Sequence, residues 1–220
     1  MKFQYVNLGQ TVLKYQVPYD IFMSLNLIYE NEFKNLPPAN KTLVGKIQNE
    51  HSLYYNGIDV KEKEIQKHNF LPYDILKWFE DVYTHYLNFN YIKDYKIHLQ
   101  SIWINEMKEH EYNPVHVHRG GIFTGLSSVM ILNLPDTYGV EYSAEDKPQN
   151  GALNMFGSST GQFAKTDYSP PLIKGDFFVF PYDMRHCVYP FNNTNQVRRT
   201  LAANCDVDYN PLENRGACAR

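Results

Sequence analysis

The feature that most constrains the fold is a change in hydrophobic pattern near Lys96. Before that point, the clearest segment begins at Pro72, which suits the first turn of a helix. Apolar residues then recur at helical spacing: Ile75, Leu76, Phe79, Val82, Tyr83, Tyr86 and Leu87. Such a broad apolar face predicts a helix that packs on a flat surface, such as a β-sheet.

A second helix is predicted earlier in the chain, with Asp20 as its N-cap and Leu36-Pro37-Pro38 beyond its end. Its apolar stripe is approximate and consists of Ile21, Phe22, Leu25, Ile28 and Tyr29. Residues 39–70 are polar and ambiguous. We therefore expect residues 1–95 to form a helical N-terminal elaboration.

After Lys96, short runs of β-forming residues alternate with glycine, proline and asparagine. The runs are 97–107, 122–134, 153–156, 176–180, 187–189 and 198–205. Helices followed by such runs predict a sandwich or barrel of mostly antiparallel strands, in the α+β or mainly β class. We expect one domain over residues 1–220, with a β core at 96–206 and a tail at 207–220.

Composition argues against several classes of function. A net charge of -3 and a pI near 6.2 provide no polybasic field, which disfavours nucleic acid or an anionic membrane as the main partner. The sequence has no apolar run of membrane-spanning length and no signal-peptide pattern at its start. Its three cysteines lack C-x-x-C spacing. These features predict a cytoplasmic protein and leave the oligomeric state open.

Three histidines carry the strongest chemical signal. His116 and His118 lie one residue apart in NPVHVHRGG, and His186 follows in GDFFVFPYDMRHCVYPF. Residues i and i+2 of a strand point to the same face, so the first two can reach one metal ion. With a third ligand from a neighbouring strand, they predict a site with open coordination positions, as non-haem iron oxygenases require.

The last predicted strand carries a candidate carboxylate clamp. Arg198 and Thr200 share a face of this strand, whereas Arg199 points to the opposite face. An arginine fork binds a carboxylate bidentately, and a hydroxyl two residues along can add a hydrogen bond. Asn105, on the strand before the histidine pair, could line the same pocket or pack in the core.

The segment from His116 to Arg198-x-Thr200 resembles the double-stranded β-helix core of Fe(II)/2-oxoglutarate-dependent dioxygenases, most of all their small phage and marine bacterial members. Besides these residues, the likeness rests on Leu132-Asn133-Leu134-Pro135, Gly175-Asp176, Phe180-Pro181, His186, Val188, Pro190 and Asn204. It covers residues 96–206. The resemblance implies a jelly-roll, or cupin-like barrel, buttressed by the N-terminal helices.

The resemblance also implies site roles and a reaction. His116 and His186 would bind Fe(II), and Arg198 with Thr200 would hold the C5 carboxylate of 2-oxoglutarate, with Asn105 as a further candidate contact. The reaction would consume O2 and couple oxidative decarboxylation of 2-oxoglutarate to hydroxylation of a peptide, an amino acid or another small molecule. Loops 136–170 would overhang the mouth of the site and set its specificity.

His118 departs from the superfamily pattern, which places Asp or Glu at this position. Three interpretations of the site compete; the first is favoured, and the strand spacing to Leu132-Asn133 argues against the second. In the first, His118 is itself the third ligand. In the second, His118 is the first histidine and Gly120 marks a missing carboxylate. In the third, a nearby carboxylate such as Asp183 or Glu106 completes the site.

Two other classes of function fit some of the same residues. A cupin-type metal enzyme would use the same barrel and explain Gly175, Pro181 and His186, but it gives Arg198-x-Thr200 no role. A non-catalytic β-sandwich binding protein would use the histidines to bind metal for stability or not at all. Metal content and 2-oxoglutarate affinity distinguish the three classes.

Overall fold

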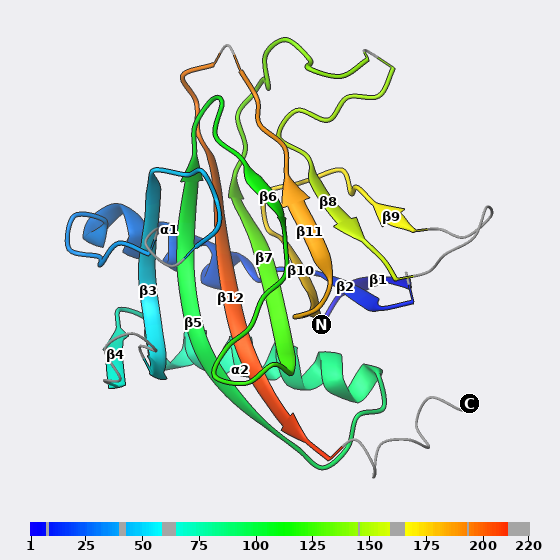
Figure 1. Ribbon diagram of the computed structural model, residues 1–220. Helices are drawn as coiled ribbons and strands as arrows, with labels where there is room; N and C mark the ends of the chain where they lie inside the picture. The colour runs from blue at the N-terminus through cyan, green and yellow to red at the C-terminus, as the bar shows by residue number, and fades with distance from the viewer. Residues whose placement is uncertain are drawn as a thin grey trace.

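Two antiparallel β-sheets face each other in the computed structural model, which describes residues 1–7, 9–39, 43–58, 65–144, 146–158, 166–192 and 194–210. The large sheet has the strand order β1-β2-β10-β7-β12-β5-β3-β4, and the small sheet has the order β6-β11-β8-β9 (Figure 1). This is a jelly-roll fold, as the resemblance implied. Among the described residues, no strand pairing joins the two sheets into a closed barrel.

The large sheet consists of β1 (Phe3–Asn7), β2 (Thr11–Gln16), β3 (Asn49–Ile58), β4 (Ile65–Asn69), β5 (Tyr95–Met107), β7 (Gly125–Asn133), β10 (Asp176–Pro181) and β12 (Arg198–Tyr209). The small sheet consists of β6 (Asn113–His116), β8 (Leu153–Phe156), β9 (Asp167–Tyr168) and β11 (Arg185–Val188). The helices are α1 (Tyr19–Glu32) and α2 (Tyr73–Phe89). No helix among the described residues is long and apolar enough to cross a membrane.

Strand alternation divides the interior into two apolar cores. Both helices lie behind the large sheet, on the face turned away from the small sheet (Figure 1), where they pack with strand residues such as Leu201 and Ala203. The inner face of the large sheet contributes Phe178 and Phe180 to a second cluster, which includes Met155 of the small sheet. Polar residues on this inner face therefore lie between the two sheets.

The helix predicted from Pro72 is confirmed as α2, with Pro72 at its N-cap position. The earlier helix is also present as α1, but the expected N-cap is wrong. Pro18 occupies that position and no side chain caps the helix, so Asp20 lies in the first turn. There its carboxylate complements the helix dipole instead of accepting a capping hydrogen bond.

The N-terminal region is not mainly helical, and the expectation of a helical elaboration over residues 1–95 is wrong in this respect. Four strands, β1 to β4, come from this region and extend the large sheet, with β2 paired to β10 and β3 paired to β5. A register shift between Ser52 and Tyr54 interrupts the alternation of β3. Because the alternation of side chains is interrupted and the segment is polar, the sequence gives no clear strand signal there.

The six runs predicted after Lys96 all contribute strands, namely β5, β7, β8, β10, β11 and β12. The apolar runs did not include the two-residue β9 or the four-residue β6, and only the spacing of His116 and His118 suggested a strand near β6. Strand β12 continues to Tyr209, beyond the expected end of the β core at 206. Of the expected tail, residues 211–220 lie outside the described residues.

Candidate metal centre and cosubstrate pocket

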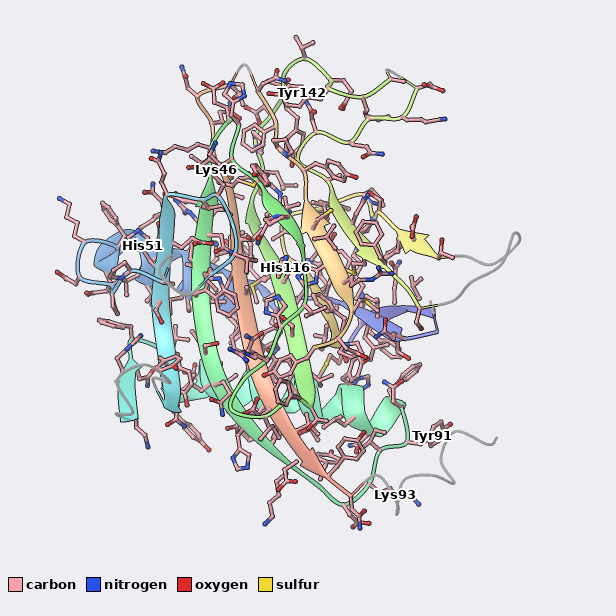
Figure 2. All side chains as sticks on the ribbon, in the orientation of Figure 1. Lys46, His51, Tyr91, Lys93, His116 and Tyr142 are labelled. Carbon is pink, nitrogen blue, oxygen red and sulfur yellow. The ribbon has the colours of Figure 1, made fainter. Side chains whose placement is uncertain are left out.

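Three histidines from the small sheet and the loop after β6 meet between the sheets. His116 is the last residue of β6 and pairs across the sheet with His186 of β11. Figure 2 shows His116 near the centre of the view, in front of the large sheet. The candidate ligand atoms of His116, His118 and His186 all lie within 4.8 Å of one another. This group of described residues contains no carboxylate.

Backbone carbonyls fix the tautomers of two of these rings. The Nδ1 atom of His116 lies 2.7 Å from the carbonyl oxygen of Pro114, and Nδ1 of His186 lies 3.0 Å from that of Met184. Because a carbonyl oxygen can only accept, each Nδ1 must carry the proton and donate it. Nε2 of both rings is then left with a lone pair, which is the arrangement that orients histidines toward a metal ion.

The spacing of the ring nitrogens fits a shared metal ion. Nε2 of His118 lies 3.1 Å from Nε2 of His186, and the two rings are nearly parallel at 6°. Two nitrogens bound about 2.1 Å from one ion at right angles are separated by about 3 Å. This pair of nitrogens therefore fits one divalent metal ion, and the candidate ligand atom of His116 lies within 4.8 Å of both.

His118 reaches this position in a different way from the one the sequence suggested. The expectation that both residues lie on one strand is wrong, because β6 ends at His116. The backbone N–H of His118 instead donates to the carbonyl oxygen of Tyr182, at 2.8 Å. The ring centroids of His116 and His118 are nevertheless 5.0 Å apart, so the loop brings both rings to one side.

A buried carboxylate anchors the loop that carries His118. Asp206 of β12 accepts hydrogen bonds from the backbone N–H groups of Gly121, at 2.9 Å, and Ile122, at 3.3 Å. Its other oxygen accepts the hydroxyl proton of Tyr182 at 3.1 Å. A Cβ atom at Gly120 would lie 1.9 Å from Asp206 Oδ1, so only glycine permits this close approach. Asp206 thus ties the loop to the large sheet.

Burial keeps the three histidines neutral near pH 7. Desolvation lowers the pKa of His186 to about 3, with a further contribution from His116. Desolvation also lowers the pKa of His116. It lowers the pKa of His118 well below the ordinary value, and the neighbouring His186 and His116 lower it further. Neutral imidazoles are the form that binds metal.

We expect the metal-free protein to lose stability as pH falls below the ordinary histidine pKa of 6.5. Between 6.5 and about 3, the unfolded chain binds a proton at His186 that the folded protein excludes. The free energy of unfolding is therefore unaffected by His186 above pH 6.5, and protonation of His186 in the unfolded chain lowers it by about 2 kcal/mol at pH 5. Urea unfolding of chelator-treated protein at pH 8 and pH 5 measures this loss. A His186→Gln variant with the same pH dependence as the wild type would contradict it.

The candidate carboxylate clamp lies on the inner face of β12. Arg198 and Thr200 are only 2% and 3% exposed, and Asn105 of β5 is the cross-strand partner of Thr200. Nε and Nη2 of Arg198 are buried without a hydrogen-bond partner among the described residues. Because an unsatisfied buried guanidinium is costly, these free donors fit an anionic ligand such as a carboxylate.

Arg199 lies on the opposite face of the large sheet, as strand alternation predicts. Its guanidinium donates to Glu106 of β5 at 2.7 Å and lies over the ring of Tyr29 in α1, 4.7 Å from the centroid. A second carboxylate, Glu30, lies 3.5 Å away. Arg199 therefore links α1 to the sheet and does not face the histidines.

The alternative sources of a third ligand occupy other positions. Glu106 is paired with Arg199 behind the large sheet, and Asp183 is exposed. Gly120 lies directly against Asp206, which is itself held by the loop and Tyr182. The geometry therefore favours His118 as the third ligand over these two alternatives.

Part of the segment 136–170 lies next to the clamp. Burial lowers the pKa of Arg198, and the neighbouring Tyr138 of this segment raises it. The side chain of Asn192 accepts from Val140 N–H and donates to Val140 C=O, which fixes the loop beside Tyr138. Residues 145 and 159–165 of the expected specificity loops lie outside the described residues.

Sequence reasoning did not identify Glu50, a buried acid on β3. It is 2% exposed, and its cross-strand partner is Asn105. Local sequence provides no signal for this placement, because it depends on the pairing of β3 with β5. Asp206 was likewise not singled out, although it stands two residues after the Asn204 that contributes to the family pattern.

Comparisons with known proteins give a family match over part of the chain and a shared fold over most of it. Residues 101–204 match the family model described as "Putative 2OG-Fe(II) oxygenase". No curated protein sequence matches the chain. The solved structures with the same fold include a Pseudomonas putida prolyl-4-hydroxylase, with 15% identity, a TM-score of 0.54, and coverage of 90% of this chain and 92% of that one.

Two further structures show the range of proteins that share this fold. A prolyl hydroxylase from Trichoplax adhaerens, in complex with a hypoxia inducible factor peptide, is 11% identical with a TM-score of 0.53, covering 97% of this chain and 89% of that one. The carbocyclase SnoK from nogalamycin biosynthesis is 11% identical with a TM-score of 0.55, covering 96% and 87%. At these identities the likeness concerns the fold alone.

Proposed function

We propose that this chain is a 2-oxoglutarate- and Fe(II)-dependent oxygenase and that it hydroxylates a small molecule or a peptide. Fe(II), 2-oxoglutarate and O2 together supply the oxidation of a substrate C–H bond, with conversion of 2-oxoglutarate to succinate and CO2. Because the net charge is -3, we favour these substrates over nucleic acid. A cytoplasmic location is part of the same proposal.

The three histidines would hold the iron through Nε2. His116 and His186 have the protonated Nδ1 atoms that this requires, and His118 supplies the third nitrogen in place of the common carboxylate. All three ligands are neutral, so the metal keeps its full double charge until an anionic ligand binds. Such a site favours a dianionic cosubstrate electrostatically.

Arg198, Thr200 and Asn105 would bind the C5 carboxylate of 2-oxoglutarate. The observation that carries this proposal is the buried guanidinium of Arg198, with two nitrogens that lack partners, on the sheet face turned toward the histidines. A cupin-type enzyme would leave these two nitrogens without a partner, and so would a β-sandwich that binds metal only for stability. Both alternatives are therefore less consistent with the structure.

Oxygen-dependent formation of succinate from 2-oxoglutarate tests the proposal without knowledge of the substrate. Metal-free protein would be reloaded with Fe(II) under argon, mixed with 2-oxoglutarate, and exposed to air, and succinate would be quantified by mass spectrometry. We expect slow succinate release that requires both Fe(II) and O2. Release that is equal with and without Fe(II), or binding of Fe(II) without binding of 2-oxoglutarate, would reject this function.

A further inference from the structure

We propose that Glu50 and Asn105 form a subsite for a positively charged group of the primary substrate, an ammonium or a guanidinium group. This inference rests on the proposed function and adds a substrate class to it. The carboxylate of Glu50 would accept hydrogen bonds from the cation, and the carboxamide oxygen of Asn105 would accept a further one.

The position of Glu50 follows from strand pairing. Trp103 and Asn105 are alternate residues of β5 and so share a face, and the Trp103 ring lies 6.1 Å from the ring of His118. Glu50 pairs directly with Asn105, and no register shift intervenes between them. Cross-strand partners project to the same side of a sheet. Glu50 therefore lies on the face that looks toward the candidate metal centre.

The two residues present unsatisfied acceptors next to each other. Glu50 is 2% exposed and Asn105 is 8% exposed. Oε2 of Glu50 and Oδ1 of Asn105 are both buried without a hydrogen-bond partner among the described residues. While Glu50 is ionised, both atoms are acceptors and cannot satisfy each other, and the described residues supply no donor to either of them.

The surroundings of Glu50 call for a cation. The nearby acid Glu111 is satisfied by the backbone N–H groups of Gln48, at 3.0 Å, and Lys108, at 2.8 Å, whereas Oε2 of Glu50 has no partner among the described residues. Burial and the charge of Glu111 raise the pKa of Glu50 to about 7. A positively charged ligand would offset the loss of hydration at the ionised Glu50 and its repulsion by the charge of Glu111.

Charge complementarity across the pocket supports the same assignment. Asn105 lies between Glu50 on β3 and Thr200 on β12, in one row of the large sheet, and Arg198 follows on the Thr200 side. An anionic cosubstrate held by Arg198 and Thr200 would lie about two strand spacings, roughly 10 Å, from Glu50. A cationic substrate group placed between them would meet negative charge on both sides.

Matched probes of equal shape and different charge test the subsite. L-lysine is compared with L-norleucine, and L-arginine with L-citrulline, each free and within a blocked Gly-X-Gly peptide. Calorimetric titration of Zn(II)- and 2-oxoglutarate-loaded protein measures binding without turnover. In the wild type we expect at least one cationic probe to bind about tenfold or more tightly than its neutral partner.

The Glu50→Gln variant should lose about 10- to 100-fold in affinity for that cationic probe and little for the neutral one. Glu109→Gln removes the same charge from an exposed position on the β5–β6 connection and should change neither affinity. At pH 8, Glu50→Gln should leave the melting temperature of ligand-free protein unchanged or higher, because it removes an unsatisfied charge.

Three outcomes would overturn the subsite. The wild type could show no preference for cationic probes, or Glu50→Gln could keep the full preference. Glu50→Gln could also have a lowered melting temperature and an equal loss of affinity for both probes. The last would assign Glu50 a structural role. Succinate release without any probe should be similar in wild type and the control variant Glu109→Gln. A wild type that releases none would reject the proposed function itself, separately from the subsite.

Discussion

Replacement of Arg198 by alanine is expected to lower kcat/KM for 2-oxoglutarate by about 100- to 1,000-fold, because it removes both arms of a buried carboxylate clamp. Arg198 is 2% exposed, and its Nε and Nη2 atoms have no hydrogen-bond partner among the described residues. Fe(II) affinity should change by less than about threefold, since the arginine is not among the candidate metal ligands. Succinate release and Fe(II) titration measure the two effects separately.

The adjacent Arg199 provides the matched control. Arg199→Ala should retain 2-oxoglutarate turnover but lower the free energy of unfolding by about 1–2 kcal/mol, through loss of the contacts with Glu106 and Tyr29. Chemical denaturation measures this cost. If Arg199→Ala abolished turnover and Arg198→Ala did not, the assignment of the two arginines to opposite faces would be incorrect.

Replacement of His118 by alanine is expected to lower Fe(II) affinity by at least about 100-fold. Removal of an outer-shell partner already costs about 10- to 100-fold, and His118 is proposed as a direct ligand. Anaerobic competition with a chelator of known affinity measures the loss. His118→Asp should bind Fe(II) well, because it restores the two-histidine, one-carboxylate set that suits this metal.

His110→Ala is the control for loss of an imidazole, since its side chain is 64% exposed and lies outside the histidine group. It should bind Fe(II) like the wild type. Equal Fe(II) affinity in His118→Ala and the wild type would make His118 a bystander and leave the third ligand to another group.

The sequence predicted most of the β core because its longer strands, unlike β6 and β9, each have a local signal. Glycine, proline or asparagine separates most of the six apolar runs after Lys96, and all six contribute strands. Arg198 and Arg199 also lie on opposite faces of β12, because alternation within one strand needs no knowledge of its neighbours.

The remaining features depend on contacts between distant segments. β3 carries Glu50 into the interior only by pairing with β5, and the register shift after Ser52 hides its period. His118 lies beyond the end of β6, and its position depends on Tyr182 and on the loop held by Asp206. The metal group was therefore predictable by residue type, whereas the route by which the chain assembles it was not.

An anaerobic crystal structure of the protein with Fe(II) and 2-oxoglutarate tests the three-histidine centre most directly. We predict that Nε2 of His116, His118 and His186 bind the metal, and that Arg198 binds the C5 carboxylate of 2-oxoglutarate. A metal bound by a carboxylate of the protein in place of His118, or a cosubstrate carboxylate held away from Arg198, would contradict this assignment.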